Sequence, residues 1–469
     1  MRILTILVLS TVYLNPLFSQ DSGSINLGMV LKQVREYHPL AKQAALLPKQ
    51  GESYLRYARG GFDPKLFFEQ REKTFKSEKY YSETNAGISL PTWFGVDLKA
   101  GYENNTGVYL SPDLKTPADG LSYAGVDVPI LRNMVTDARR TGVRQAQLFK
   151  EQTVAMREQL LNELAQQVIQ DYANWYFTWQ ERAICQQAVT LLKERMNAIR
   201  SEFAAGGKSA ADTIETAAQL GSFNILYRDA SAKEYKSRMI LSAHLWTENN
   251  VPITINEGIT PVYTGLDFLD SMMQGFPDSI VSGSIQNLQP TLQILDLYVQ
   301  KNKLEMRLKR QAMLPELKLK YRALSPGYFE YPAGNSVGMN STFGLGFSST
   351  LFLRKERGEF ELSKIAWQES GLQFQQKTRE AAQKVSGLYR EAITYTALSR
   401  DFAIISDQYK QLYENEKTRF SAGDATVFMV NIRETRWIET LLKLNQYREK
   451  QVLSATYYLE MAGVIGRIF

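Results

Sequence analysis

The segment Gly207-Lys208-Ser209 is the best candidate in the sequence for a ligand-binding motif, because it matches the end of a phosphate-binding loop. In such a loop, backbone amides and the lysine hold phosphate groups. The loop also requires a glycine five residues before Gly207, where this chain has Glu202, and a strand that leads into it. A long helical pattern precedes Lys208 instead. We therefore interpret the segment as a turn that binds no nucleotide.

Other reactive side chains are few and are not spaced for catalysis. His38 and His244 are the only histidines, and neither stands in the spacing typical of a metal site. Cys185 is the only cysteine, so no disulfide can form within the chain. Acidic residues such as Glu158 and Glu163 fit solvated helix faces better than acid/base pairs. The sequence therefore predicts no enzyme, no cofactor and no metal site.

The net charge and the first twenty residues indicate where the chain acts. The formal charge is +6, and the basic excess is spread along the chain rather than gathered in a patch, so no nucleic-acid partner is expected. Residues 1–20 combine Arg2 with an apolar stretch and a polar end, which predicts a signal peptide rather than a buried N-terminal strand or helix. Beyond it no run of about 18 apolar residues occurs, so we expect an exported chain without a membrane-spanning helix.

The sequence contains an internal duplication. A spacing of 25 residues separates two prolines in each half, and these are Pro39 and Pro64, then Pro290 and Pro315. The motif Glu-Phe-Ala-Ala-Gly at 202–206 returns as Arg-Phe-Ser-Ala-Gly at 419–423. Landmarks repeated in one order indicate that both halves are built from the same elements. The first half has about 34 additional residues between its landmarks.

Each half is predicted to hold a helix, a strand region and a long helical hairpin. Apolar residues in the first long helix recur at steps of three or four, and they are Leu161, Leu164, Val168, Tyr172, Trp175, Trp179, Val189, Leu192, Met196, Ile199 and Phe203. A similar series runs through 385–420. Arg182 and Gln186 interrupt the first series, so looser packing is expected there. A helix on the order of 100 Å long must pack lengthwise against other helices.

A glycine marks the turn at the end of each long helix. Gly206 and Gly423 stand where a helix C-terminus favours a left-handed residue. Ser209 and Asp212 then form a capping-box pattern for the returning helix, whereas the second half has Met429 at the position of the acid. Each half is therefore expected to end in a defined hairpin tip.

The segments between the helices alternate between apolar and polar residues. Near 320, one face holds Leu317, Leu319, Tyr321 and Ala323, and the other holds Lys318, Lys320 and Arg322. The alternation is typical of a transmembrane barrel and equally of a half-buried soluble sheet. Two hairpins would give about four strands, too few to close a barrel in lipid and with free edges. Three copies of the chain would supply about twelve strands.

This ordered duplication resembles the TolC-like outer-membrane efflux proteins, over nearly all of the chain after the leader. The residues that carry the resemblance are Leu314-Pro315-Glu316-Leu317-Lys318-Leu319 before a strand, and the tips Phe203-Ala204-Ala205-Gly206 and Phe420-Ser421-Ala422-Gly423. It implies a homotrimer whose twelve-stranded β-barrel, in outer-membrane lipid, stands on a long α-helical barrel in the periplasm. It also implies a passive exit duct of a tripartite efflux or type I secretion system, joined to a periplasmic adaptor protein and an inner-membrane transporter.

The resemblance further implies that the periplasmic tips form the gate and the adaptor-docking site. The residues expected there are Phe203, Gly206, Lys208, Asp212, Glu215, Phe420, Gly423 and Asp424. Asp212 matches a family position where acids narrow the entrance, and it fits a helix cap equally well. Met429 and Ile432 stand where family members carry acids in the second repeat. A strong acidic ring is therefore not expected in this chain.

The expected fold is mostly α with a transmembrane β part, built from two copies of a helix, a strand pair and a long helical hairpin. The expected parts are a signal peptide at 1–20, a first repeat at 21–246 with strands at about 63–131 and a hairpin at 135–246, an irregular connecting segment at 247–283, and a second repeat at 284–469 with strands at about 315–353 and a hairpin at 356–462. The alternative interpretation is a soluble periplasmic coiled-coil adaptor or scaffold, which would lack this near-symmetric duplication.

Overall fold

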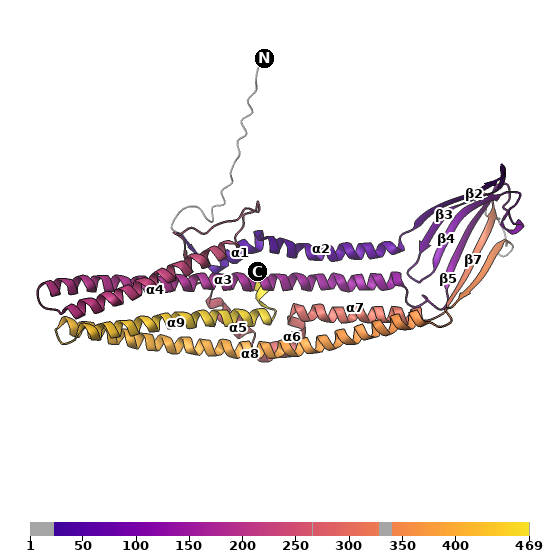
Figure 1. The fold of residues 1–469 in the computed structure, drawn as a ribbon. Helices are drawn as coiled ribbons and strands as arrows, with labels where there is room; N and C mark the ends of the chain where they lie inside the picture. The colour runs from indigo at the N-terminus through magenta and orange to yellow at the C-terminus, as the bar shows by residue number, and fades with distance from the viewer. Residues whose placement is uncertain (1–22, 265, 328–339, 469) are drawn as a thin grey trace, which may run out of the picture. The chain divides into compact units, whose positions relative to one another are not determined.

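The computed structural model describes residues 23–264, 266–327 and 340–468, so the signal peptide expected at 1–20 lies outside the described residues. The chain divides into two compact units. The first unit takes the described residues up to 45, then 157–290 and those from 378 on, and the second takes 46–156 and 291–377. Three helices, α2 (Pro39–Arg59), α3 (Ala138–Ala204) and α8 (Arg354–Ser421), each contribute more than one residue to both units (Figure 1).

Helices dominate the described chain. The others are α1 (Leu27–Tyr37), α4 (Ala210–Ser242), α5 (Asp267–Gly275), α6 (Asp278–Leu288), α7 (Pro290–Ala312) and α9 (Val427–Met461), with 3-10 turns at Gly60–Phe62, Pro112–Leu114 and Ile465–Ile468. With 67 and 68 residues, α3 and α8 each extend on the order of 100 Å. Over the described residues, no helix has a stretch that is both long and apolar enough to cross a membrane.

The segment at 247–283, expected to be irregular, contains α5 and the beginning of α6. Leu269 and Met273 in α5 stand four residues apart and are buried, and Val281 and Ile285 in α6 repeat that spacing. Pro277 occupies the position just before α6, where its fixed backbone angle suits a helix start. Each of these helices has only one pair of buried apolar residues at helical spacing. So short a pattern cannot be distinguished from a loop in the sequence.

Four helices meet in a hydrophobic core of the first unit. Leu192 of α3, Phe223 of α4, Tyr413 of α8 and Trp437 of α9 are all buried in it. The rings of Tyr413 and Trp437 stack with their centroids 5.3 Å apart. The apolar series of the long helix therefore packs lengthwise against three other helices, as its three- and four-residue steps require.

At the interruption of that series, Arg182 forms an ion pair with a buried carboxylate. An Arg182 guanidinium nitrogen lies 3.3 Å from a carboxylate oxygen of Glu234, which is buried in α4. The indole nitrogen of Trp175 donates to the other oxygen of the same carboxylate at 3.1 Å. Gln186 lies on the exposed side of α3. The polar residue at this interruption therefore has a specific partner on α4.

The second unit contains one antiparallel sheet of six strands (Figure 1). They are β2 (Lys65–Phe75), β3 (Glu78–Pro91), β4 (Asp97–Thr106), β5 (Leu121–Pro129), β7 (Glu316–Pro326) and β8 (Ser341–Ser348), paired in that order. The sheet has two strands more than the four or so that the sequence analysis expects. In the first unit, β1 (Ser24–Ile25) and β6 (Thr260–Pro261) form a separate parallel pair.

The hairpin of β2 and β3 turns through only two residues. Lys76 and Ser77 have φ angles of 53° and 60°, both in the left-handed region. Two such residues in succession form the turn that matches the natural twist of a tight hairpin. That turn usually contains Asn-Gly, which is absent here.

The two faces of the sheet differ in polarity. Directly opposed residues on neighbouring strands place one apolar face across all six strands, and it consists of Leu66, Phe68, Ala86, Ile88, Leu90, Leu98, Ala100, Ala124, Val126, Val128, Leu317, Leu319, Tyr321, Ala323, Phe343, Leu345 and Phe347. The opposite, polar face carries ion pairs such as Lys99 with Asp127 at 2.6 Å. Its Tyr123 hydroxyl donates to Asn85 at 3.0 Å.

Several large side chains of the apolar face are exposed, which is unusual for a water-soluble sheet. On the apolar face, Phe343, Leu345 and Phe347 are 60–68% exposed. On the polar face, Tyr123 is only 2% exposed. A soluble half-buried sheet hides its apolar face against a core. In the described chain the large apolar side chains of this face are instead exposed on β2, β3, β4 and β8 and partly buried on β5 and β7.

Candidate functional site

The first tip joins α3 to α4 through a left-handed glycine. Gly206 has a φ angle of +81°, its amide donates to the Phe203 carbonyl at 2.9 Å, and the Gly207 amide donates to the Glu202 carbonyl at 2.8 Å. This bond across five residues closes the last turn of α3 in the manner of a Schellman cap. A Cβ atom on Gly206 would meet nothing within 4 Å, so the backbone angle alone requires glycine.

The second tip repeats this geometry between α8 and α9. Gly423 has a φ angle of +85°, and its amide donates to the Phe420 carbonyl at 3.1 Å. The Asp424 amide donates to the Arg419 carbonyl at 2.9 Å, again across five residues. Thr426 then caps α9 by accepting the Met429 amide. Both tips therefore share one backbone design, although only their glycines and the preceding phenylalanine and alanine are the same in sequence.

Asp212 is part of a complete capping box. The Ser209 hydroxyl oxygen accepts the Asp212 amide at 3.2 Å, and the Asp212 carboxylate accepts the Ser209 amide at 3.0 Å. The side-chain and backbone hydrogen bonds from Ser209 lower the pKa of Asp212, and the Lys208 ammonium adds to the effect. The carboxylate is thus ionised and engaged in its own tip. This supports the cap assignment of Asp212, while a gating role stays a prediction.

One contact joins the two tips directly. The Lys208 ammonium lies 4.7 Å from the centroid of the Phe420 ring, and it also lies 3.7 Å from a Glu202 carboxylate oxygen. A cation over an aromatic face is attracted by the electron density of the ring. Lys208 therefore connects the end of α3 with the end of α8.

The other predicted tip residues are arranged around this contact. Phe203 is about half exposed on α3, Glu215 is partly buried one turn into α4, and Asp424 is exposed beside Gly423. The Asp424 carbonyl accepts a hydrogen bond from the Arg419 guanidinium at 3.3 Å. All eight predicted residues lie at the two tips, but of these only Lys208 and Phe420 have a described contact across them.

Two apolar residues at the tips were missed by the sequence analysis. Ile214, in the first turns of α4, is 69% exposed, and Phe428, in the first turn of α9, is 53% exposed. Their signal in the sequence is an apolar residue placed one step outside the packed helix face. With Phe203 they give each tip an exposed apolar side chain, of the kind found at protein interfaces.

A buried polar network lies among the four helices that carry the tips. The Arg195 guanidinium of α3 pairs with the fully buried Glu434 carboxylate of α9 and donates to the Asn431 side chain at 2.8 Å. The Gln219 amide of α4 donates to the Thr435 hydroxyl at 2.8 Å. Burial raises the pKa of Glu434, and the Arg195 charge opposes that rise. The network links α3 and α4 of the first half to α9 of the second.

The two histidines lie together in the first unit without forming a metal site. Their ring centroids are 5.7 Å apart, and His244 contacts the Asp171 carboxylate at 2.8 Å. The His38 ring accepts the Leu40 amide at 3.2 Å, and burial together with His244 lowers the pKa of His38 to about 4. Within the described chain, no group of three or more His, Cys, Asp or Glu side chains is placed to hold a metal ion.

Solved structures share this fold, although sequence comparisons find no relative. No protein-family model matches the chain, and no curated protein sequence does so. The fold is similar to that of the CmeC outer-membrane channel of Campylobacter jejuni, with a TM-score of 0.62 at 13% identity over 93% of this chain and 85% of that one. It is similar to the open MtrE outer-membrane channel of Neisseria gonorrhoeae, with a TM-score of 0.63 at 14% identity over 94% and 88%.

A third similar structure is the outer-membrane protein VceC of Vibrio cholerae, with a TM-score of 0.62 at 12% identity over 93% of this chain and 96% of that one. At these identities the comparison establishes the fold. The similarity spans both units of this chain and most of each channel.

Proposed function

We propose that this chain, which has the fold of outer-membrane channels, belongs to the TolC-like outer-membrane efflux proteins and forms a passive exit duct as a homotrimer. The sheets of the copies would close a β-barrel in outer-membrane lipid, and the helical hairpins would lie in the periplasm. The duct would serve a tripartite efflux or type I secretion system. Cargo would move through a water-filled lumen, and the chain itself would carry out no catalysis.

One observation carries this proposal, and it is the exposed apolar face of the sheet. A water-soluble protein rarely leaves a contiguous apolar patch that crosses six strands, because its contact with water is unfavourable. Lipid removes that cost, while the polar face with Lys99 and Asp127 suits a water-filled interior. The two edge strands, β2 and β8, would leave unpaired backbone groups in lipid unless further copies cover them.

The alternative of a soluble periplasmic adaptor or scaffold accounts for the helical hairpins but not for the sheet. An adaptor would also be expected to share only part of its length with a channel. The chain instead aligns with 85–96% of the length of the three channels compared. These two points favour the duct.

Fractionation of cells that express the mature chain tests the proposal. The protein is expected in the outer-membrane fraction, to require detergent for extraction and to elute as a trimer. A detergent-free monomer that washes off with the periplasmic proteins would exclude the duct and favour the adaptor.

The tips are proposed to receive a periplasmic adaptor protein, which in turn contacts an inner-membrane transporter. Each tip combines a rigid glycine turn with exposed apolar side chains, among them Phe203, Ile214 and Phe428. A rigid turn presents these side chains at a fixed position, which is favourable for docking because little ordering is needed on binding.

Replacing Gly206 or Gly423 with valine is expected to reduce export while the amount of trimer in the membrane stays roughly constant. A residue with a Cβ atom in the left-handed region costs about 1–2 kcal/mol, and a β-branched residue fits there least well, so the turn should rearrange. The measurements are the cargo exported by cells, the adaptor that co-purifies and the trimer in the outer membrane.

Gly207→Val is the matched control for this pair of variants. Gly207 does not have a left-handed backbone, and a Cβ atom there would lie 3.5 Å from the Glu202 carbonyl, an ordinary contact. This variant should export nearly as well as the parent chain. Unchanged export in both Gly206→Val and Gly423→Val would count against docking at the tips.

A further inference from the structure

The number of strands in the sheet determines the size of the β-barrel wall that copies of this chain can form. All six strands alternate in direction, and every neighbouring pair is antiparallel. The first edge strand, β2, begins shortly after the helical segment before it, and the last, β8, ends shortly before α8 begins. Because β2 and β8 run in opposite directions, β8 of one copy can pair with β2 of the next without breaking the antiparallel pattern.

The apolar face reaches both edges of the sheet, although on β2 it holds Gln70 and Glu72 after Leu66 and Phe68. Leu66 and Phe68 on β2 are 82% and 69% exposed, and they lie directly opposite Ile88 and Ala86 on β3. On the other edge, Leu345 lies opposite Leu319 of β7 on the same face. A hairpin that hung outside the lipid wall would not need to keep its apolar residues in register with the strands of that wall. The continuous register favours a position of β2 and β3 in the same barrel as the other four strands.

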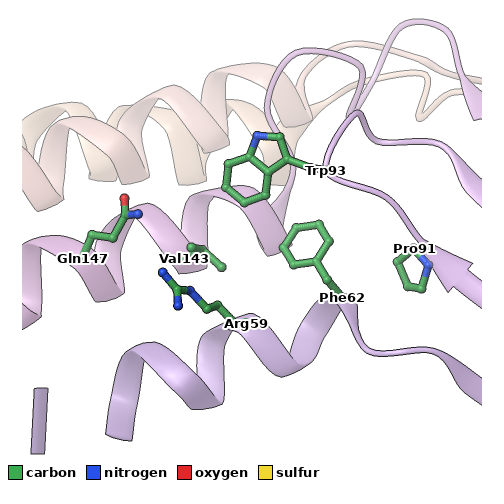
Figure 2. Close-up of a pocket in the computed structure, with 6 residues that line it drawn as sticks. All are labelled: Arg59, Phe62, Pro91, Trp93, Val143 and Gln147. Carbon is green, nitrogen blue, oxygen red and sulfur yellow. The ribbon is translucent and has the colours of Figure 1, made fainter. Parts of the chain in front are cut away.

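The turn between β3 and β4 also contacts the ends of the helices next to the sheet. The turn between β3 and β4 places the Trp93 ring 5.3 Å from Phe62, which follows α2 directly (Figure 2). Beside it, Asp97 at the start of β4 forms an ion pair of 2.9 Å with Arg139 in the first turn of α3. The turn and the two helix ends line a common pocket, formed by Arg59, Phe62, Pro91, Trp93, Val143 and Gln147. These contacts attach β3 and β4 to the ends of α2 and α3.

We propose that β8 of each copy pairs with β2 of the next, so that the proposed trimer is closed by eighteen strands rather than twelve. This inference rests on the proposed function and deepens it, since it identifies the partner of each free edge as a second copy of the chain. Barrel diameter grows roughly in proportion to strand number, so the wall would be about 1.5 times as wide as a twelve-stranded one. Barrels of 16–18 strands leave an aqueous channel, which suits bulky polar cargo.

Cysteine cross-linking in the intact trimer tests which strand meets β8. In a Cys185→Ala background, Leu345→Cys on β8 is combined with one further cysteine. That cysteine is placed either on the apolar side of β2, at Leu66, Phe68, Gln70 or Glu72, or on that of β4, at Leu98, Ala100, Tyr102 or Asn104. Within one chain, β5 and β7 separate β4 from β8, and β2 lies two strands further away. Strands are spaced about 4.8 Å apart, whereas a disulfide requires Cα atoms within about 7 Å, so any bond formed joins two copies.

Leu319→Cys with Leu345→Cys is the positive control, because these residues are directly opposed on β7 and β8 and should form a bond within one chain. We expect at least one β2 position, and none on β4, to give disulfide-linked multimers on a non-reducing gel. Bonds to β4 would show a twelve-stranded barrel with β2 and β3 displaced from it. This result would overturn the inference but leave the proposed function unaffected. No bond in either panel from an intact trimer would overturn it too. A monomer in detergent would instead overturn the proposed function as well.

Discussion

Replacing Leu345 with arginine is expected to remove most of the assembled protein from the outer membrane, whereas arginine at the neighbouring Gly346 should leave most of it in place. Leu345 lies between Phe343 and Phe347 on the apolar side of β8, and its side chain is 60% exposed. An arginine near the middle of a bilayer costs about 2–4 kcal/mol, and a trimer would contain three. The measurement is the amount of folded trimer in the outer-membrane fraction, which should fall at least tenfold.

The Gly346 variant is a close control because it puts the same side chain on the adjacent residue of the same strand. A Cβ atom at Gly346 would meet nothing within 4 Å, and the side chain would extend from the polar face. Lys318 lies opposite, and two like charges there should cost no more than about 1 kcal/mol. If the sheet were exposed to water, arginine at the exposed Leu345 position would cost little, and the two variants would behave alike.

Replacing Arg195 with methionine is expected to lower the stability of the helical tip region by about 3–5 kcal/mol, because the fully buried Glu434 carboxylate would lose its charged partner. Arg200→Met is the matched control, since Arg200 is exposed on the same helix five residues later. The measurement is thermal unfolding together with protease cleavage at the tips. The double variant Arg195→Met with Glu434→Met should recover most of the loss, because no buried charge would remain.

The pH dependence of the Arg195→Met variant provides a separate check. Burial already raises the pKa of Glu434, and removal of the arginine charge should raise it further. A carboxyl group with a raised pKa in the folded state binds protons there that the unfolded state does not hold. Stability is therefore lost as pH rises through the folded pKa and regained as pH falls. The defect should be smaller at pH 5 than at pH 8. An equal defect at both would indicate lost packing rather than an unpaired charge.

The tips could be predicted from the sequence because their signals are local. A helix end that closes on a left-handed glycine needs that glycine at one position, and Gly206 and Gly423 supply it. The capping box of Ser209 and Asp212 also depends only on residues three apart. The cation contact of Lys208 with Phe420 joins residues that are distant in sequence, so it could not be anticipated from spacing.

The strand count could not be predicted because two signals were weak. The hairpin of β2 and β3 turns at Lys76 and Ser77, whose side chains give no sign that both adopt left-handed angles. Along β2 the apolar alternation stops after Phe68, and Gln70 and Glu72 take the next places on that face. Residues 63–131 were recognised as a strand region, but the segment before 96 carried no clear second hairpin.

The buried network around Arg195 was hidden for a different reason. Its partners Asn431 and Glu434 lie in the second half of the chain, and only the packing of four helices brings them together. In the sequence, Arg195 is one more charged residue next to the apolar Met196. Nothing local separates a buried arginine from one that extends into solvent.

The pairing of β5 with β7 determines when the sheet can be completed. Ser122 of β5 lies opposite Ser325 of β7, about 200 residues later in the chain. During synthesis, β2 to β5 are therefore available long before β7, and one side of β5 stays open meanwhile. An open strand edge readily recruits a foreign chain. The long interval between these strands thus leaves β5 open to pairing with a wrong strand until β7 is available.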